Sequence, residues 1–199
     1  MINYAHDQGW CAPIKVKGLP VEKPIRKAVG DDYMNTLRPH LPPNLYALML
    51  FLYTTGRRVG EAVTLTWDDI DLENGTVFIA QTKNGNAATA ILTAELCEIL
   101  DDMERTDPVF GYTDRRNIYG SLKRACKRAG VEYLGTHQVG RHSFATQLER
   151  QGWSPKSIAD AGGWKSTRIV NETYTHPDAA AARATELIGK KLASSRQAE

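Results

Sequence analysis

The sequence predicts a mainly α-helical α+β fold in which the β-structure is a single hairpin. Most of the chain from residue 30 onward divides into stretches with helical spacing of apolar residues, N-capping side chains at their starts and glycine at their ends. Only residues 75–92 favour β-structure, because two β-favouring runs flank Asn84-Gly85, the strongest short signal for a hairpin turn.

The composition is that of an ordinary globular protein, with 42% hydrophobic and 24% charged residues. No apolar run approaches the roughly 20 residues of a membrane span, and the first residues lack the pattern of a signal peptide. Cys11, Cys97 and Cys126 are odd in number and lack metal-ligand spacing, which favours reduced thiols and a cytoplasmic protein. The net charge of +2 is weak evidence for nucleic acid, so any DNA affinity depends on where the cations lie.

Residues 1–29 are predicted to be the end of a helix followed by a basic linker, because proline and basic residues alternate there without periodicity. We expect one folded domain at 30–192 and a polar tail at 193–199. Within the domain, Asp31 or Asp32 can cap a helix through about Arg38. Prolines 42 and 43 break it and begin a second helix through residue 55, apolar on nearly every side and therefore buried.

A short helix and a turn are expected at 57–71, followed by the hairpin. Thr93 can cap an amphipathic helix with an acidic exposed face and four inward apolar residues, Leu96, Ile99, Leu100 and Met103. The next helix, at about 114–130, is strongly basic and can bind a nucleic-acid backbone; a solvated surface is the alternative. Its basic residues are Arg115, Arg116, Lys123, Arg124, Lys127 and Arg128.

Three short helical segments follow. The first, VGRHSFATQLERQG, has Val139, Phe144 and Leu148 at helical spacing, and the second begins with Ser154-Pro155 and ends at Gly162-Gly163. The third ends near Tyr174. An alanine-rich helix is expected after His176-Pro177, with apolar residues that could pack on the domain or on a neighbouring copy, namely Leu187, Ile188 and Leu192.

Within about forty residues, the segment from Thr136 to His176 contains histidine, arginine and tryptophan side chains that can donate hydrogen bonds, together with a tyrosine hydroxyl. Arginine binds phosphate oxygens with two parallel hydrogen bonds. A tyrosine among such donors could attack phosphorus. No Gly-rich phosphate loop, paired-aspartate motif or HExxH motif occurs in the sequence, so we expect neither a metal nor another cofactor.

Several ordered motifs across residues 30–190 resemble the tyrosine recombinase (phage integrase) family. They are HQVGR, GGW and TYTH in the last third, TKNG in the hairpin, and the T-G-x-R-x-x-E pattern at residues 55–61. The resemblance implies that family's catalytic-domain fold, mainly α-helical with a small antiparallel sheet. It also implies a catalytic set of Arg58, Lys83, His137, Arg141, Trp164 and Tyr174, with Glu61 as the buried partner of Arg58.

Two features depart from the family pattern. His137 precedes Arg141 by four residues where three is usual, and Gln138 stands at the usual position. Both spacings lie on one helical face, so either residue could reach the phosphate, although glutamine cannot transfer a proton. Trp164 stands where histidine is commoner, and lies ten residues before Tyr174.

The resemblance implies a site-specific DNA recombinase, an integrase of a phage or mobile element, that works through a 3′-phosphotyrosyl intermediate. Its partner would be double-stranded DNA, bound by a homo-oligomer (a tetramer) on paired sites, with accessory DNA-bending proteins possible. A DNA-clamping domain would precede the linker, whose Lys15 and Lys17 would lie along phosphates with Arg115, Arg116, Lys123, Arg124 and Lys127. The alternatives are a type IB topoisomerase and a non-catalytic DNA-binding protein on the same fold.

Overall fold

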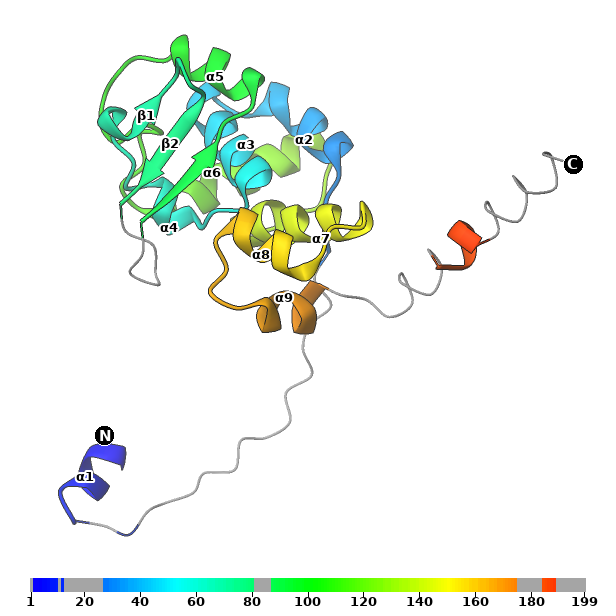
Figure 1. Cartoon of the computed structure of the whole chain (residues 1–199). Helices are drawn as coiled ribbons and strands as arrows, with labels where there is room; N and C mark the ends of the chain where they lie inside the picture. The colour runs from blue at the N-terminus through cyan, green and yellow to red at the C-terminus, as the bar shows by residue number, and fades with distance from the viewer. Residues whose placement is uncertain (1, 11, 13–26, 81–86, 175–183, 189–199) are drawn as a thin grey trace, which may run out of the picture.

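The computed structural model describes residues 2–10, 12, 27–80, 87–174 and 184–188, and confirms a mainly helical fold with one small antiparallel sheet (Figure 1). The elements are α1 (Ile2–Asp7), α2 (Asp31–Leu37), η1 (Arg38–His40), α3 (Pro43–Thr55), α4 (Val59–Ala62), η2 (Trp67–Asp69), β1 (Ile70–Asp71), β2 (Thr76–Ile79), β3 (Ala88–Ile91), α5 (Ala94–Asp101), α6 (Arg115–Ala129), η3 (Gln138–His142), α7 (Ser143–Arg150), α8 (Pro155–Gly162) and α9 (Thr167–Tyr174).

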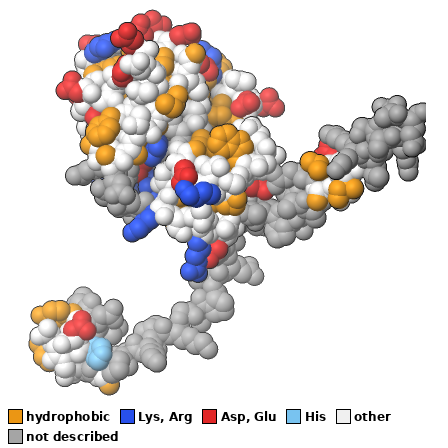
Figure 2. Space-filling model, in the orientation of Figure 1, with side chains coloured by type: hydrophobic (Ala, Val, Ile, Leu, Met, Phe, Trp, Pro, Cys, Tyr) orange, Lys and Arg blue, Asp and Glu red, His pale blue; other side chains and the backbone are white. Residues whose placement is uncertain are grey.

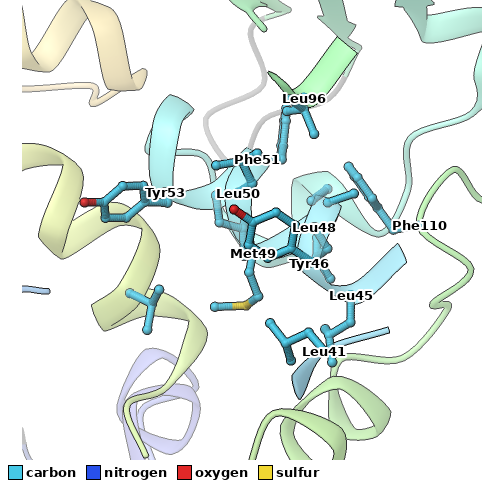
Figure 3. Packing of buried hydrophobic residues seen from close by; sticks show 14 of the residues in the cluster. Leu41, Leu45, Tyr46, Leu48, Met49, Leu50, Phe51, Tyr53, Leu96 and Phe110 are labelled. Atoms are coloured by element: carbon cyan, nitrogen blue, oxygen red, sulfur yellow. The ribbon is translucent and has the colours of Figure 1, made fainter. Parts of the chain in front are cut away.

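Helix α3 is the centre of the main hydrophobic core, as its almost uniformly apolar sequence predicts. Ten of its thirteen residues are buried, from Leu45 to Tyr53 and then Thr55. Figure 3 shows its side chains leaving the helix in several directions, with Leu96 of α5 and Phe110 meeting them. The rings of Phe51 and Phe110 lie 5.7 Å apart, within the range of favourable aromatic pairs.

The sheet has the strand order β1-β2-β3, and both pairs are antiparallel. Strand β2 alternates, with Val77 and Ile79 in the core and Phe78 outside. The pairing of Ile79 with Ala88 fits the predicted hairpin, whose turn lies outside the described residues together with Lys83. Strand β1 was missed, because a two-residue edge strand has too little pattern to be distinguished from a turn.

The start of α2 differs from the prediction. Gly30 is the N-cap, and Asp31 and Asp32 are the first helical residues. The carboxylate of Asp31 accepts a hydrogen bond of 2.7 Å from the Tyr53 hydroxyl of α3, a tertiary contact that replaces a capping bond. Carboxylates in the first turn also favour the helix, because they lie at its positive end.

The predictions for α5 and α8 hold with one adjustment. Thr93 caps α5 by accepting a hydrogen bond from the Leu96 backbone, and Leu96 and Leu100 are fully buried; Ile99 and Met103, expected inside as well, are half-buried. Ser154 caps α8, which begins at Pro155 and ends at Gly162, with Gly163 as its C-cap. None of the helices in the described ranges is long and apolar enough to cross a membrane.

Helices α7, α8 and α9 form the end of the domain opposite α5, with a second hydrophobic cluster between them (Figure 1). Its buried members are Ala145, Ile158, Ala159, Trp164, Val170 and Tyr174. The alanine-rich helix expected after Pro177 lies largely outside the described residues. Leu187 and Ile188 are within them and are exposed.

Candidate functional site

Arg58 and Glu61 form the first part of the site, at the start of α4. The side-chain Nη1 of Arg58 donates to Glu61 Oε1 at 2.8 Å, and its backbone N–H donates to Glu61 Oε2 at 3.0 Å. Glu61 is buried, whereas the Arg58 side chain remains 30% exposed and lines a cavity. The carboxylate therefore orients a guanidinium that can still reach a ligand.

The HQVGR segment contains a π-helical turn, η3, that the sequence did not predict. A π-turn holds one more residue than an α-turn, so it accommodates the extra residue between His137 and Arg141. His137 and Arg141 both line the cavity, and Gln138 is not among the lining residues. Gly140 permits this geometry, because a Cβ there would lie 2.8 Å from Leu52 Cβ of α3.

The π-turn also changes which residues of α7 are buried. Phe144 and Leu148, which the sequence places at helical spacing with Val139, are half-buried and pack against the second cluster, whereas Val139 is buried in the main core. The buried positions of α7 are Ser143, Ala145, Thr146 and Glu149. The physical reason is that one added residue rotates every later side chain around the helix axis relative to a regular α-helix.

Arg141 is the most buried cation that lines the cavity, with 4% exposure. Its Nη1 donates to the carbonyls of Gly56 at 2.7 Å and Gly162 at 2.8 Å, and its Nη2 lies 3.4 Å from the carbonyl of Gly163. The guanidinium carbon lies 3.7 Å from the centre of the Trp164 ring, a close cation–π contact. Arg141 therefore joins the end of α3 to the turn between α8 and α9.

Tyr174 ends α9 with its ring buried at 2% exposure, and it lines the same cavity. Its ring lies 5.7 Å from that of Trp164, edge to face, and 5.3 Å from that of His142. Trp164 in turn stacks on Phe144 at 6.4 Å. The tyrosine is thus held by aromatic packing at the cavity wall.

The cavity has a volume of about 950 Å³ and collects six of the predicted site residues from segments far apart in the sequence, namely Arg58, Glu61, His137, Arg141, Trp164 and Tyr174. Arg115, predicted as a contact to the DNA backbone, lines it as well. Sequence reasoning assigned no role to the other polar lining residues, Thr64, Asp69, Tyr119, Thr136 and Thr173; of these, Thr173 alone lies within a quoted motif, TYTH.

The charges around the cavity do not balance. Arg58, Arg115 and Arg141 line it and Arg57 is buried beside Arg58, whereas the carboxylates at the cavity are those of Glu61 and Asp69. Four cations against two anions leave two positive charges among these residues. The carboxylate of Asp69, also at the cavity, accepts hydrogen bonds from the backbone and hydroxyl of Thr66 at 2.9 and 3.0 Å.

Burial makes this excess charge unfavourable without a ligand. Desolvation, helped by the nearby charge of Arg58, lowers the pKa of Arg141 to about 10, and Glu61 and Tyr174 oppose that shift. The pKa of Arg57 is lowered as well, mainly by burial. Because a value of about 10 is still above neutral pH, Arg141 stays charged there, and an anion in the cavity would relieve the cost.

The remaining basic candidates lie away from the cavity or outside the described residues. On α6, Arg116, Lys123, Arg124 and Lys127 are exposed, and Arg116 pairs with Asp114. Figure 2 shows acidic side chains gathered at the end of the molecule that carries α5, which agrees with the acidic face predicted for that helix. Lys15 and Lys17 fall outside the described residues, as does Lys83.

The family model that matches this chain is that of the phage integrase family, over residues 28–181. A tyrosine recombinase XerC-like protein of Caldanaerobacter subterraneus is 26% identical over 231 residues, covering 87% of this chain and 59% of the relative. Tyrosine recombinase XerA of Thermococcus kodakarensis is 28% identical over 177 residues, covering 81% of this chain and 62% of the relative. The chain spans about half the length of the curated relatives it matches, from 37% to 62% of the eight compared.

Solved structures share the fold. The crystal structure of XerA recombinase superposes with a TM-score of 0.66 at 23% identity, covering 84% of this chain and 66% of that one. The Tn1549 transposon integrase in complex with transposon right end DNA gives a TM-score of 0.69 at 18% identity, covering 94% of this chain and 75% of that one. Because the family model matches most of this chain and the fold agrees, the chain belongs to the phage integrase family.

Proposed function

We propose that this chain is the catalytic domain of a site-specific DNA recombinase that cleaves and rejoins DNA through a 3′-phosphotyrosyl link. The observation that carries the proposal is the excess of positive charge from arginines in and beside a cavity that Tyr174 lines. A phosphodiester attacked by a tyrosinate forms a transition state with two negative charges. Fixed cations stabilise such a state without reorganising, which is a large catalytic effect.

The roles follow from this arrangement. Arg58 and Arg141 bind the non-bridging oxygens of the phosphate, with His137 and Trp164 at the same cavity. Tyr174 loses its hydroxyl proton to solvent and attacks as the tyrosinate, which the neighbouring arginines stabilise. Its oxygen forms a bond to phosphorus as the bond to the 5′-oxygen breaks, and the departing 5′-oxygen takes a proton. The family resemblance assigns this proton to Lys83. Attack by a 5′-hydroxyl on the phosphotyrosine reseals the strand and returns the proton, so no ATP is consumed.

Duplex DNA is the substrate that fits these contacts, and the Tn1549 integrase structure is described as a complex with DNA. Arg115 at the cavity and the exposed cations of α6 would bind flanking phosphates, which makes affinity strongly salt-dependent. Strand exchange needs a copy of the chain at each cleaved strand. We therefore expect a tetramer on two paired sites, with accessory DNA-bending proteins where the sites require them.

Covalent capture tests the proposal directly. A library of nicked duplexes with randomised cores is incubated with the protein, and adducts that survive SDS are isolated, sequenced and digested for mass mapping. The nick lets the short 5′-hydroxyl strand diffuse away, so the intermediate accumulates. We expect an adduct on the Tyr174 peptide that forms equally in excess EDTA, because arginines supply the positive charge. DNA binding without any adduct would instead favour the non-catalytic alternative.

The role of Lys83 has its own test, a substrate with sulfur in place of the bridging 5′-oxygen. General acid catalysis contributes about 10²–10⁴-fold, so Lys83→Ala should slow cleavage of ordinary DNA by roughly that factor. Sulfur is a far better leaving group and needs no proton. The variant should therefore cleave the sulfur substrate at nearly the wild-type rate in a single-turnover assay.

Arg141→Lys is the matched control in that assay, because a defect in charge stabilisation is not corrected by a better leaving group. If sulfur rescues neither variant, or rescues both equally, Lys83 is not the proton donor. His137, which lies at the cavity, then becomes the first candidate.

A further inference from the structure

Arg57 stands at one of the positions of the T-G-x-R-x-x-E segment to which the motif assigns no role, and its placement is unusual for an arginine. Its side chain is buried, with 4% exposure, and it lies behind the cavity and does not line it. Nη2 donates to the carbonyl of Thr89, in β3, at 3.2 Å. The guanidinium is thereby attached to the sheet.

The other side of the same guanidinium fits against Gly163. A Cβ built on Gly163 would lie 2.3 Å from Arg57 Nη1, so a side chain at position 163 and the guanidinium cannot occupy this space together. Gly163 also has φ of +65°, a conformation that glycine adopts without strain. Arg57 thus fills the space between strand β3 and the turn that carries Trp164.

Burying the Arg57 guanidinium in this way is unfavourable for folding when no ligand is bound. The Nε atom of Arg57 is buried without a hydrogen-bond partner, and no carboxylate of the described residues lies within ion-pair distance. One neutral carbonyl and the charge of Glu61 do not offset the desolvation of this guanidinium, because burial still lowers the pKa of Arg57. Well-packed apolar side chains in place of buried charges are often neutral or stabilising. An apolar residue such as methionine would therefore suit this position better if packing were its only role.

We propose that Arg57 is a positioning residue of the phosphate site: it holds the Trp164 turn against strand β3 and places a buried positive charge behind Arg58 and Arg141. The inference rests on the proposed function. The bound phosphate adds negative charge where cations outnumber carboxylates, so the cost of burying Arg57 is recovered when DNA is bound. Through Trp164, the same contact keeps the indole beneath Arg141 and beside Tyr174.

Two variants test this assignment, Arg57→Met and Arg57→Lys, each measured by thermal unfolding without DNA and by the single-turnover rate of adduct formation. Arg57→Met should unfold at the wild-type temperature or above it, because a buried charge is removed. Its cleavage should be roughly 10²-fold slower, the size of effect expected when reacting groups are misplaced by about 1 Å. Arg57→Lys keeps the charge but not the planar fork, so it should recover part of the rate.

Arg105→Met provides the matched control, since Arg105 is an exposed arginine that pairs with Asp101. Its cleavage rate should equal the wild-type rate. The assignment is overturned if Arg57→Met cleaves at the wild-type rate, or if its unfolding temperature falls together with its rate, which is what a purely structural residue would show. If the wild-type protein forms the adduct, the recombinase proposal stands. Either outcome for Arg57→Met then counts only against the role of Arg57.

The Trp164 indole supplies a readout that does not depend on cleavage. In a spectrum of ¹⁵N-labelled tryptophan side chains, Trp164→Phe identifies the Trp164 signal. Arg57→Met should shift that signal and Arg105→Met should not. An unmoved signal in Arg57→Met would contradict the contact between Arg57 and the turn.

Discussion

Replacement of Tyr174 by phenylalanine is expected to abolish covalent capture of DNA while leaving DNA affinity unchanged and the domain folded. The change removes one oxygen and keeps the ring, whose packing against Trp164 and His142 holds α9 in place. The arginines that bind phosphate remain. The measurements are adduct yield on the captured nicked substrate, binding by fluorescence anisotropy, and thermal unfolding.

The control for this experiment is Tyr119→Phe, which removes the same atom from another tyrosine that lines the cavity. This variant should form the adduct at the wild-type level. An adduct that persists in Tyr174→Phe, or that is lost equally in both variants, would remove Tyr174 from the role of nucleophile.

Arg141→Lys should lower the cleavage rate by about 10²–10³-fold, the loss typical of removing one donor that stabilises a developing oxyanion. Arg141 donates to the carbonyls of Gly56 and Gly162 and lies over the Trp164 ring. A lysine ammonium keeps the charge but has no planar fork, so it cannot hold both carbonyls and the phosphate in this geometry. Single-turnover cleavage at saturating protein measures the effect.

Thermal unfolding of the same variant separates its two roles. Some loss of stability is expected, because buried carbonyls lose a donor. Arg150→Lys, at the exposed end of α7, makes the same chemical change outside the cavity and should leave both measurements unchanged. A cleavage rate for Arg141→Lys within a few-fold of the control would show that charge alone suffices at this position.

Much of the fold could be predicted because the signals are local. The burial of α3 follows from its nearly uniform apolar sequence, and the starts of α5 and α8 follow from Thr93 and Ser154, which bond to backbone groups three residues away. The β2–β3 pairing follows from β-favouring runs around Asn84-Gly85. Arg58 and Glu61 are neighbours on one helical turn, so their contact was also predictable.

Contacts between distant segments were decided by the tertiary structure alone. The sequence left His137 and Gln138 as alternatives, and the π-turn packed on α3 is what puts His137 at the cavity. The π-turn also rotates α7, so Phe144 packs against the second cluster although Val139 lies in the main core. The motif pattern distinguished Arg58 from Arg57, but the burial of Arg57 depends on β3 and on the space at Gly163, which are 32 and 106 positions away in the chain. Capping and periodicity are properties of neighbouring residues, whereas the desolvation of a charge depends on every element packed around it.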